Sequence, residues 1–206
     1  MTKKKSKHHW RSLQNQDSYF RKSKIKGFRS RSTFKLIEID NKFKILQPSI
    51  SILDLGASPG GWSQYSAKKL KDKATLIALD IQTMEKIDNV EFILGDFCNH
   101  ETQKMILKGN LMNKFDLIIS DISPEKTGNN VTDQYHFYNI ANEILEFSKK
   151  GLKSNGTIVI KVFMGLGFQR FIKESKRIFK KTTIFKPKSS RSESKETYLI
   201  ASTIRL

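Results

Sequence analysis

The chain has 206 residues, of which 37% are hydrophobic, so it is long enough for one domain with a sizeable core. A net charge of +18, from 38 lysines and arginines against 20 aspartates and glutamates, favours a polyanionic partner such as nucleic acid over a merely solvated lysine-rich surface. Cys98 is the single cysteine, which excludes an intrachain disulfide and a cysteine-based metal cluster. No apolar run reaches the roughly 18 residues that cross a bilayer, and no apolar stretch follows the charged N-terminus. We therefore expect a cytoplasmic protein without a membrane segment, secretory signal or metal.

Residues 1–31 form a basic N-terminal arm in which Asp17 is the only acidic residue. Aromatic side chains are interleaved with the lysines and arginines, at Trp10, Tyr19, Phe20 and Phe28. Cations for phosphates and flat rings for bases suit RNA. The alternative is a flexible solubilising tail, above all for the first ten residues.

A helical pattern begins at Ser32 and ends before Pro48. Apolar runs then alternate with amphipathic stretches. The runs predict strands at residues 51–55, 75–80, 90–94, 115–120 and 157–163. The stretches between them predict helices at residues 62–70, 132–150 and 167–180. Because the runs are almost continuously apolar, their strands should be covered on both faces, as in a parallel sheet.

Two final runs, residues 182–185 and 197–204, have no helix between them and should pair antiparallel. The alternation as a whole predicts an α/β domain over residues 32–206, with helices on both faces of the sheet.

The first predicted strand is followed by a glycine-rich turn and a helix, in the sequence DLGASPGGW from Asp54 to Trp62. Such a turn lets the backbone approach a ligand at the carboxyl edge of the sheet. It lacks the Gly-x-Gly-x-x-Gly pattern of dinucleotide sites and the Gly-Lys-Ser/Thr ending of a P-loop. On its own it would be equally typical of a tight strand-to-helix connection.

Aspartates end or follow the next three strands, at Asp80, Asp96 and Asp121. Each alone would suit a solvated strand end or a helix cap. Together with the glycine turn they indicate one ligand crevice, in which Asp80 accepts hydrogen bonds from ribose hydroxyls and Asp96 faces an adenine amino group.

With these motifs the sequence resembles the FtsJ/RrmJ family of ribose methyltransferases, and in particular its members that act on large-subunit ribosomal RNA. The resemblance runs from about Arg29 to the C-terminus. It rests on four segments in a fixed order: DLGASPGGW, SDISP from Ser120, KVFMG from Lys161 and SSRSESKETY from Ser189.

The resemblance implies a Rossmann-like methyltransferase fold with a seven-stranded, mostly parallel sheet whose last strand is antiparallel. It implies S-adenosyl-L-methionine as cofactor. The residues that it assigns to the cofactor are Gly60, Trp62, Asp80, Asp96 and Asp121. The residues that it assigns to catalysis are Lys35, Asp121, Lys161 and Glu196. The sequence departs from the family in the loop after Asp121, where Glu125 and Lys126 are charged.

The chemistry of ribose methylation explains why lysines and carboxylates are needed. The ribose hydroxyl must lose a proton as the methyl group arrives, so the protein must align the reacting atoms and accept that proton. Lys161 stands inside an apolar strand, which is unusual for a lysine without partners; the alternative is a lysine that extends to the surface. We assign Lys161 as the base, Asp121 as the group that orients it, and Lys35 and Glu196 as residues that position the ribose.

The resemblance therefore implies an enzyme that methylates a uridine ribose at the 2'-oxygen in the RNA of the large ribosomal subunit, and we expect it to act as a monomer. Three alternatives stay open at this stage. A methyltransferase of the same fold could act on an RNA cap, a transfer RNA or a protein. The chain could be a non-catalytic RNA-binding assembly factor, which the four filled catalytic positions disfavour. A nicotinamide-dependent oxidoreductase is disfavoured by the glycine pattern.

Overall fold

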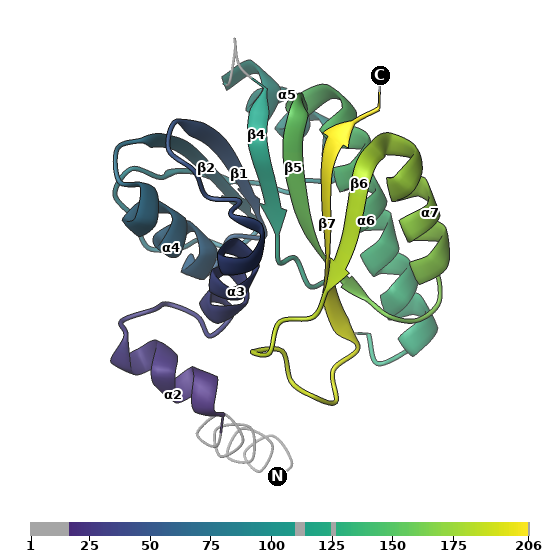
Figure 1. Ribbon diagram of the computed structural model, residues 1–206, viewed down its shortest axis with the longest axis horizontal. Coiled ribbons are helices and arrows are strands. Elements are labelled where there is room, and N and C mark those ends of the chain that lie inside the picture. The colour runs from purple at the N-terminus through teal and green to yellow at the C-terminus, as the bar shows by residue number, and fades with distance from the viewer. Residues whose placement is uncertain (1–16, 110–113, 125–126, 206) are drawn as a thin grey trace.

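A computed structural model describes residues 17–109, 114–124 and 127–205 (Figure 1). Its centre is a seven-stranded sheet in the order β3-β2-β1-β4-β5-β7-β6. The strands are β1 (Ile50–Leu55), β2 (Ala74–Asp80), β3 (Glu91–Leu94), β4 (Phe115–Ser120), β5 (Leu152–Phe163), β6 (Phe179–Phe185) and β7 (Glu196–Ile204). All five predicted internal strands are present, with ends that differ from the prediction mainly at β5, which begins five residues earlier.

Strand β7 is the antiparallel member of the sheet. Strands β3, β2, β1, β4 and β5 pair in parallel, whereas β7 runs antiparallel to both β5 and β6. The register places Lys161 of β5 opposite Tyr198 of β7, and Phe163 opposite Glu196. The predicted antiparallel pairing of the two C-terminal runs and the Rossmann-like methyltransferase fold are both confirmed.

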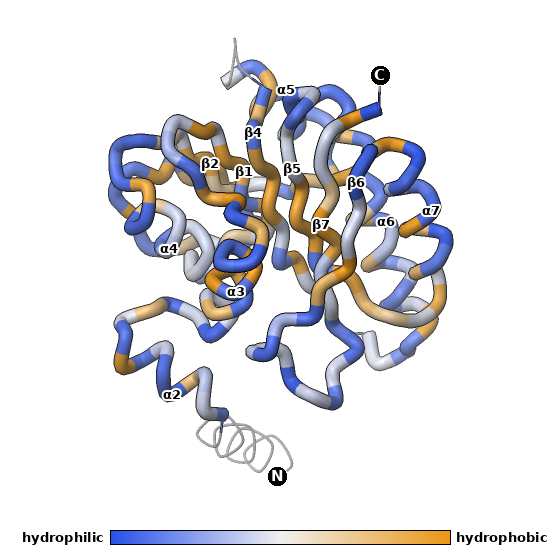
Figure 2. Tube along the Cα trace, viewed as in Figure 1, coloured by the Kyte–Doolittle hydropathy of each residue, from blue (hydrophilic) through white to orange (hydrophobic). Residues whose placement is uncertain are grey.

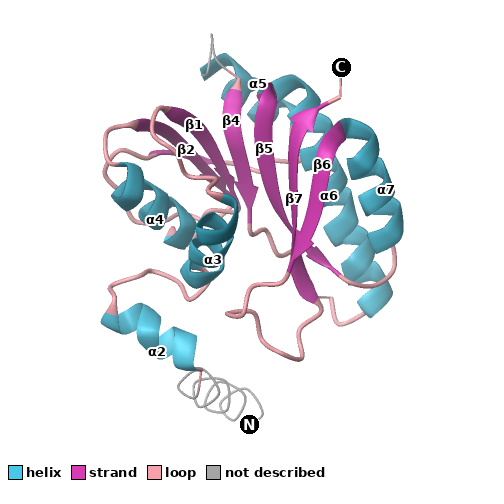
Figure 3. Cartoon of the chain, in the orientation of Figure 1, coloured by secondary structure: helices cyan, strands magenta, loops and turns pink. Residues whose placement is uncertain are grey.

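Helices cover both faces of the sheet, and Figures 2 and 3 show the apolar strands between them. One face packs on α3 (Thr33–Phe43) and α4 (Gly61–Leu70), through core residues such as Leu36 and Trp62. The other face packs on α5 (His100–Gly109), α6 (Asn130–Gly151) and α7 (Phe168–Ile178), through Ile106, Ile144 and Phe171. Burial on both faces explains why the strands are almost continuously apolar.

The helices differ from the predictions in several places; α6, for example, begins two residues earlier, at Asn130. Helix α7 ends at Ile178, two residues before the predicted end, because Phe179 already pairs with Ile204 as the first residue of β6. Helix α5 was not predicted. Its sequence is mostly polar, its large apolar residues are the three consecutive residues Met105, Ile106 and Leu107, and it buries only Ile106.

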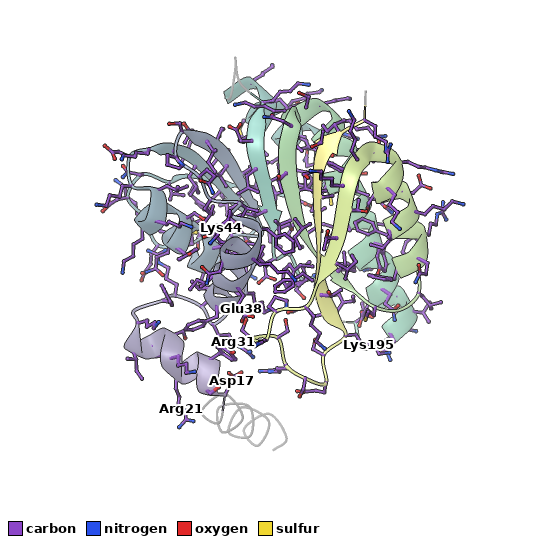
Figure 4. The ribbon with its side chains drawn as sticks, viewed as in Figure 1. Asp17, Arg21, Arg31, Glu38, Lys44 and Lys195 are labelled. Carbon is purple, nitrogen blue, oxygen red and sulfur yellow. The ribbon has the colours of Figure 1, made fainter. Side chains whose placement is uncertain are left out.

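The described part of the predicted arm contains helix α2 (Ser18–Ile25). Its N-cap is Asp17, whose carboxylate accepts hydrogen bonds from the backbone N–H groups of Tyr19 and Phe20. Asp17 also forms an ion pair with Arg31, and both are labelled in Figure 4. The ring of Tyr19 contacts that of Phe34 in α3. Trp10, the first ten residues, Glu125 and Lys126 lie outside the described residues.

Candidate active site

Three carboxylates meet at the carboxyl edge of the sheet, as predicted from the strand ends. Asp80 ends β2, Asp96 follows β3 and Asp121 follows β4. All three line one cavity of about 430 Å³. Apolar side chains, including Ile81, Phe97 and Ile140, form much of the rest of its wall. The cavity therefore combines an acidic set of acceptors with a surface that can contact a flat ring.

Backbone hydrogen bonds fix two of these carboxylates. Asp80 accepts from the N–H of Ser58 at 2.9 Å and from that of Gln82 at 2.8 Å, and Asp96 accepts from the N–H of Cys98 at 2.9 Å. A carboxylate has about four lone-pair sites, so both groups can still accept hydrogen bonds from a ligand.

The glycine turn after β1 brings its backbone close to the loop after β4. Gly56 has a φ of +73°, and a side chain at this position would overlap Ile122. Only glycine allows both the positive φ and this approach, and Gly56 and Ile122 both line the cavity.

Gly60 and Trp62 are not among the residues that line this cavity. Gly60 is the N-cap of α4 with a φ of +103°, and a Cβ there would lie 2.9 Å from the guanidinium of Arg29. Trp62 is 2% exposed, and its indole N–H donates to the carbonyl of Ser32 at 2.9 Å. Trp62 thereby anchors the N-terminal end of α3, the helix that carries Lys35. A direct contact of these two residues with a cofactor stays a prediction.

Asp54, in β1, is 1% exposed and does not line the cavity, but it is close enough to Asp80 and Asp121 for their charges to act on it. Burial raises its pKa to about 7, although the hydroxyl of Ser63 donates a hydrogen bond to its carboxylate at 2.6 Å and opposes the shift. The nearby charges of Asp121 and Asp80 contribute to the same rise in pKa. A buried carboxyl group near two of the cavity's carboxylates therefore releases its proton only near neutral pH.

The four predicted catalytic residues form two ion pairs. Lys161 is 5% exposed, and its Nζ donates to the backbone carbonyl of Asp121 at 2.6 Å and lies 3.3 Å from Asp121 Oδ1. Lys35 Nζ lies 2.7 Å from Glu196 Oε1. Lys161 is thus buried with a partner and does not extend to the surface, which decides between the two alternatives for this residue.

Tyr198 connects the two pairs. Its hydroxyl donates to Asp121 Oδ1 at 2.7 Å, and Lys35 Nζ lies 5.9 Å from the centre of its ring. Burial would raise the pKa of Asp121, but the charges of Lys161 and Lys35 and the hydrogen bonds from Tyr198 and Lys161 lower it below its ordinary value. Burial, the charges of Asp121 and Glu196 and the hydrogen bond to Asp121 raise the pKa of Tyr198 well above 10. Asp121 is therefore an anion and Tyr198 a neutral donor.

Sequence reasoning did not single out Tyr198 and Ser190 as members of this cluster. Tyr198 faces Lys161 across the β5–β7 ladder, and Ser190 donates to Glu196 Oε1 at 2.8 Å. The antiparallel pairing of the last strands was predicted, but its register was not. Knowledge of the β5–β7 register would have identified Tyr198 as the residue opposite Lys161.

The arrangement can bind a ligand in the acidic cavity and present a lysine nitrogen to a second substrate beside it. Asp121 belongs to both parts, since it lines the cavity and holds Lys161. Within residues 17–109, 114–124 and 127–205, no group of histidine, cysteine and acidic side chains could hold a metal ion. No helix in the same ranges is long and apolar enough to span a membrane.

Together, the sheet order and the ligand cavity at its carboxyl edge define a Rossmann-like methyltransferase. The chain belongs to the FtsJ-like methyltransferase family, which matches residues 28–203. It is 42% identical over 205 residues to the ribosomal RNA large subunit methyltransferase E of Pelagibacter ubique (strain HTCC1062), an alignment that covers 100% of both chains. It is 45% identical over 186 residues to the protein of the same name from Wolbachia pipientis wMel, covering 90% of this chain and 94% of that protein.

A solved structure agrees with the fold. The crystal structure of a ribosomal RNA methyltransferase from Plasmodium falciparum matches with a TM-score of 0.78 at 29% identity, covering 86% of this chain and 98% of the other. The resemblance to the FtsJ/RrmJ family is therefore confirmed.

Proposed function

We propose that this protein transfers a methyl group from S-adenosyl-L-methionine to the 2'-oxygen of a uridine ribose in large-subunit (23S) ribosomal RNA, as a step in ribosome maturation. The observation that carries the proposal is Lys161, buried, paired with Asp121 and placed beside the acidic cavity. The names of the full-length relatives support ribosomal RNA as the substrate.

The cavity fits this cofactor better than it fits a dinucleotide. S-adenosyl-L-methionine supplies a methyl group on a positively charged sulfur. Three carboxylates around the cavity favour a cation and disfavour a pyrophosphate. Asp80 would accept hydrogen bonds from the ribose of the cofactor, Asp96 from its adenine amino group, and Asp121 would border the methyl donor. We keep Gly60 and Trp62 as cofactor-site residues, through the turn and the helix start that they support.

The chain's own residues would handle the hydroxyl proton. Lys161, once it has lost its own proton, would accept the proton of the ribose hydroxyl as the oxygen attacks. Asp121 fixes the position of the Lys161 nitrogen through two of its oxygens. Lys35 and Glu196, joined at 2.7 Å and close to Tyr198, would position the ribose.

We further propose that residues 1–31 act as an RNA-binding arm on the methyltransferase domain of residues 32–206, and that the protein acts as a monomer in the cytoplasm. The charge of +18 supports contact with phosphates. Helix α2 carries Arg21, Lys22 and Lys24, and Lys26 is its C-cap residue.

The test is methylation in vitro with a labelled cofactor. Purified large subunits, small subunits, free ribosomal RNA and transfer RNA are offered side by side, and the modified nucleotide is then mapped. We expect label on the 2'-oxygen of a uridine in the large-subunit RNA, either free or assembled. Label confined to transfer RNA would redirect the proposal to that substrate, and no label on any RNA would overturn it.

A further inference from the structure

A second cavity, of about 410 Å³, opens beside the proposed catalytic cluster, and none of the residues assigned to the cofactor lines it. It lies between the first turns of α6, the end of β5 and the segment before β7. It shares Ser123 and Pro124 with the first cavity, so the two are separated by the loop after β4. Phe163 forms part of its wall, and the centre of the Phe163 ring lies 5.9 Å from Lys161 Nζ.

The lining of this cavity combines aromatic, flexible apolar and amide side chains. Phe137 and Phe163 meet edge to face with ring centres 4.9 Å apart, and Met164 is 51% exposed beside them. Lys195 is exposed at the segment before β7, where Figure 4 labels it. Aromatic walls with a nearby cation suit a base that is attached to a phosphate backbone.

Gln134 gives the cavity a specific polar group. Its Oε1 is buried and accepts no hydrogen bond from any described residue. Gly165 packs so closely on this amide that a side chain there would overlap it. A buried acceptor without a donor is costly, typically about 1–3 kcal/mol, and a ligand N–H would remove that cost. Asp133, the acidic residue of the lining, already accepts from the backbone N–H and the hydroxyl of Thr127.

We infer that this cavity binds the base of the nucleotide whose ribose is methylated, and that Gln134 accepts a hydrogen bond from a ring N–H of that base. The inference rests on the proposed function. The base is joined to the ribose carbon next to the one that bears the 2'-hydroxyl. A ribose held with this hydroxyl at Lys161 must therefore place its base within a few ångströms of the lysine, and the first cavity is taken by the methyl donor. The second cavity is adjacent to Lys161, and its aromatic and amide lining suits a flat heterocycle with an N–H donor.

The experiment compares Gln134→Ala with wild type on two RNAs. One carries the mapped target uridine, and the other carries 3-methyluridine at that position, which removes the ring N–H. Tyr135→Ala is the matched control, because Tyr135 is the next residue of α6, is 66% exposed and does not line the cavity. Binding of S-adenosylhomocysteine to each variant verifies that it is folded.

For wild type we expect the single-turnover rate at sub-saturating RNA to fall about 10-fold or more on the 3-methyluridine RNA. Gln134→Ala should show a similar loss on the uridine RNA and little further loss on the modified one, and Tyr135→Ala should behave like wild type. The inference would be overturned if wild type and Gln134→Ala had equal rates on the uridine RNA. It would also be overturned if 3-methyluridine lowered the rates of both proteins by the same factor. Either outcome would leave the proposed function intact. If wild type methylates no RNA, both fail.

Discussion

The hydroxyl of Tyr198 donates a hydrogen bond of 2.7 Å to Oδ1 of Asp121, the same oxygen that lies 3.3 Å from Lys161 Nζ. One carboxylate oxygen thus has a neutral donor on one side and the proposed base of the reaction on the other. Because Asp121 also lines the first cavity, this hydrogen bond joins the proposed cofactor site to the proposed catalytic pair.

Tyr198→Phe should slow methyl transfer and lower stability. The change removes a donor to a buried carboxylate, for which we expect a loss of about 1.5–3 kcal/mol in the free energy of unfolding. The single-turnover rate should fall about 10-fold, because the Asp121 side chain is held less firmly against Lys161. Tyr65→Phe is the control, since the hydroxyl of Tyr65 donates to Asp40 at 3.1 Å, away from the site. It should lower stability and leave the rate unchanged; equal rate losses in both variants would show that Tyr198 acts only through stability.

Lys161→Ala should abolish methyl transfer, with a loss of at least about 100-fold, while the affinity for cofactor stays nearly unchanged. In the proposed mechanism the lysine acts on the substrate proton, whereas the carboxylates hold the cofactor. Lys161→Arg should fail as well, because a guanidinium keeps the charge but does not lose its proton in a protein. Lys35→Ala should reduce the rate less, as expected of a residue that positions the ribose.

The measurement for these variants is single-turnover methylation, with calorimetry of S-adenosylhomocysteine binding alongside. A Lys161→Arg variant with a near-normal rate would mean that the residue contributes positive charge only. Proton removal would then have to be assigned to Asp121 or to water.

The sequence predicted the strands and the carboxylates well because both depend on local pattern. A strand buried on both faces is apolar throughout, and the carboxyl ends of parallel strands meet at one edge, so Asp80, Asp96 and Asp121 could be placed together without coordinates. Helix α5 was missed because it buries only Ile106.

Neighbours from distant segments could not be predicted in the same way. The position of Tyr198 depends on the β5–β7 register, and the depth of Asp54 depends on the packing of α4 through Ser63. The cavity that contains Gln134 is formed by three segments far apart in the chain. In each case the sequence shows the residue but not its neighbours.

Asp80→Ala should weaken cofactor binding about 10-fold or more by removing the acceptor for the ribose hydroxyls. Asp80 also accepts from the backbone of Ser58 and Gln82, so the turn after β1 should loosen. Asp80→Asn keeps one carbonyl oxygen, which can accept only one of these two hydrogen bonds because Ser58 and Gln82 donate to different oxygens of Asp80, and it should show a smaller loss than Asp80→Ala. Calorimetry with S-adenosyl-L-methionine and S-adenosylhomocysteine gives the affinities. Binding of neither compound to wild type, with tight binding of a nicotinamide dinucleotide, would overturn the assignment of the cavity.

Deletion of residues 1–16 should weaken RNA binding and make it less dependent on salt. The deletion removes the five cations Lys3, Lys4, Lys5, Lys7 and Arg11 and no acidic residue. It leaves Asp17, which caps α2, and Arg29, which donates to the carbonyls of Glu85 and Lys86. For each phosphate that the shortened protein no longer neutralises, the slope of log affinity against log salt should fall by about 0.7 on single-stranded RNA. Cofactor affinity should not change. Identical RNA affinities at matched salt would identify these residues as a solvated tail.

Asp54 should make the protein less stable as the pH rises from about 4 to about 7. Its pKa is raised from 3.8 to about 7 by burial, so between these values the folded protein keeps a proton that the unfolded chain has lost. The stabilisation from this group is complete below the unfolded pKa and is lost as the pH rises through the folded one. The total change is on the order of 4 kcal/mol.

Asp54→Asn should remove this dependence, because an amide does not ionise and its carbonyl can still accept from Ser63. Urea unfolding at a series of pH values from about 4.5 to about 8 gives the free energy of unfolding of each protein. We expect the free energy of unfolding of Asp54→Asn to increase relative to that of wild type as the pH rises. Asp88→Asn, at an exposed carboxylate, should have the same pH dependence as wild type. Parallel curves for Asp54→Asn and wild type would mean that Asp54 is already ionised in the folded protein at the acidic end of the series. The buried charge near Asp80 and Asp121 would then be permanent and not one acquired near neutral pH.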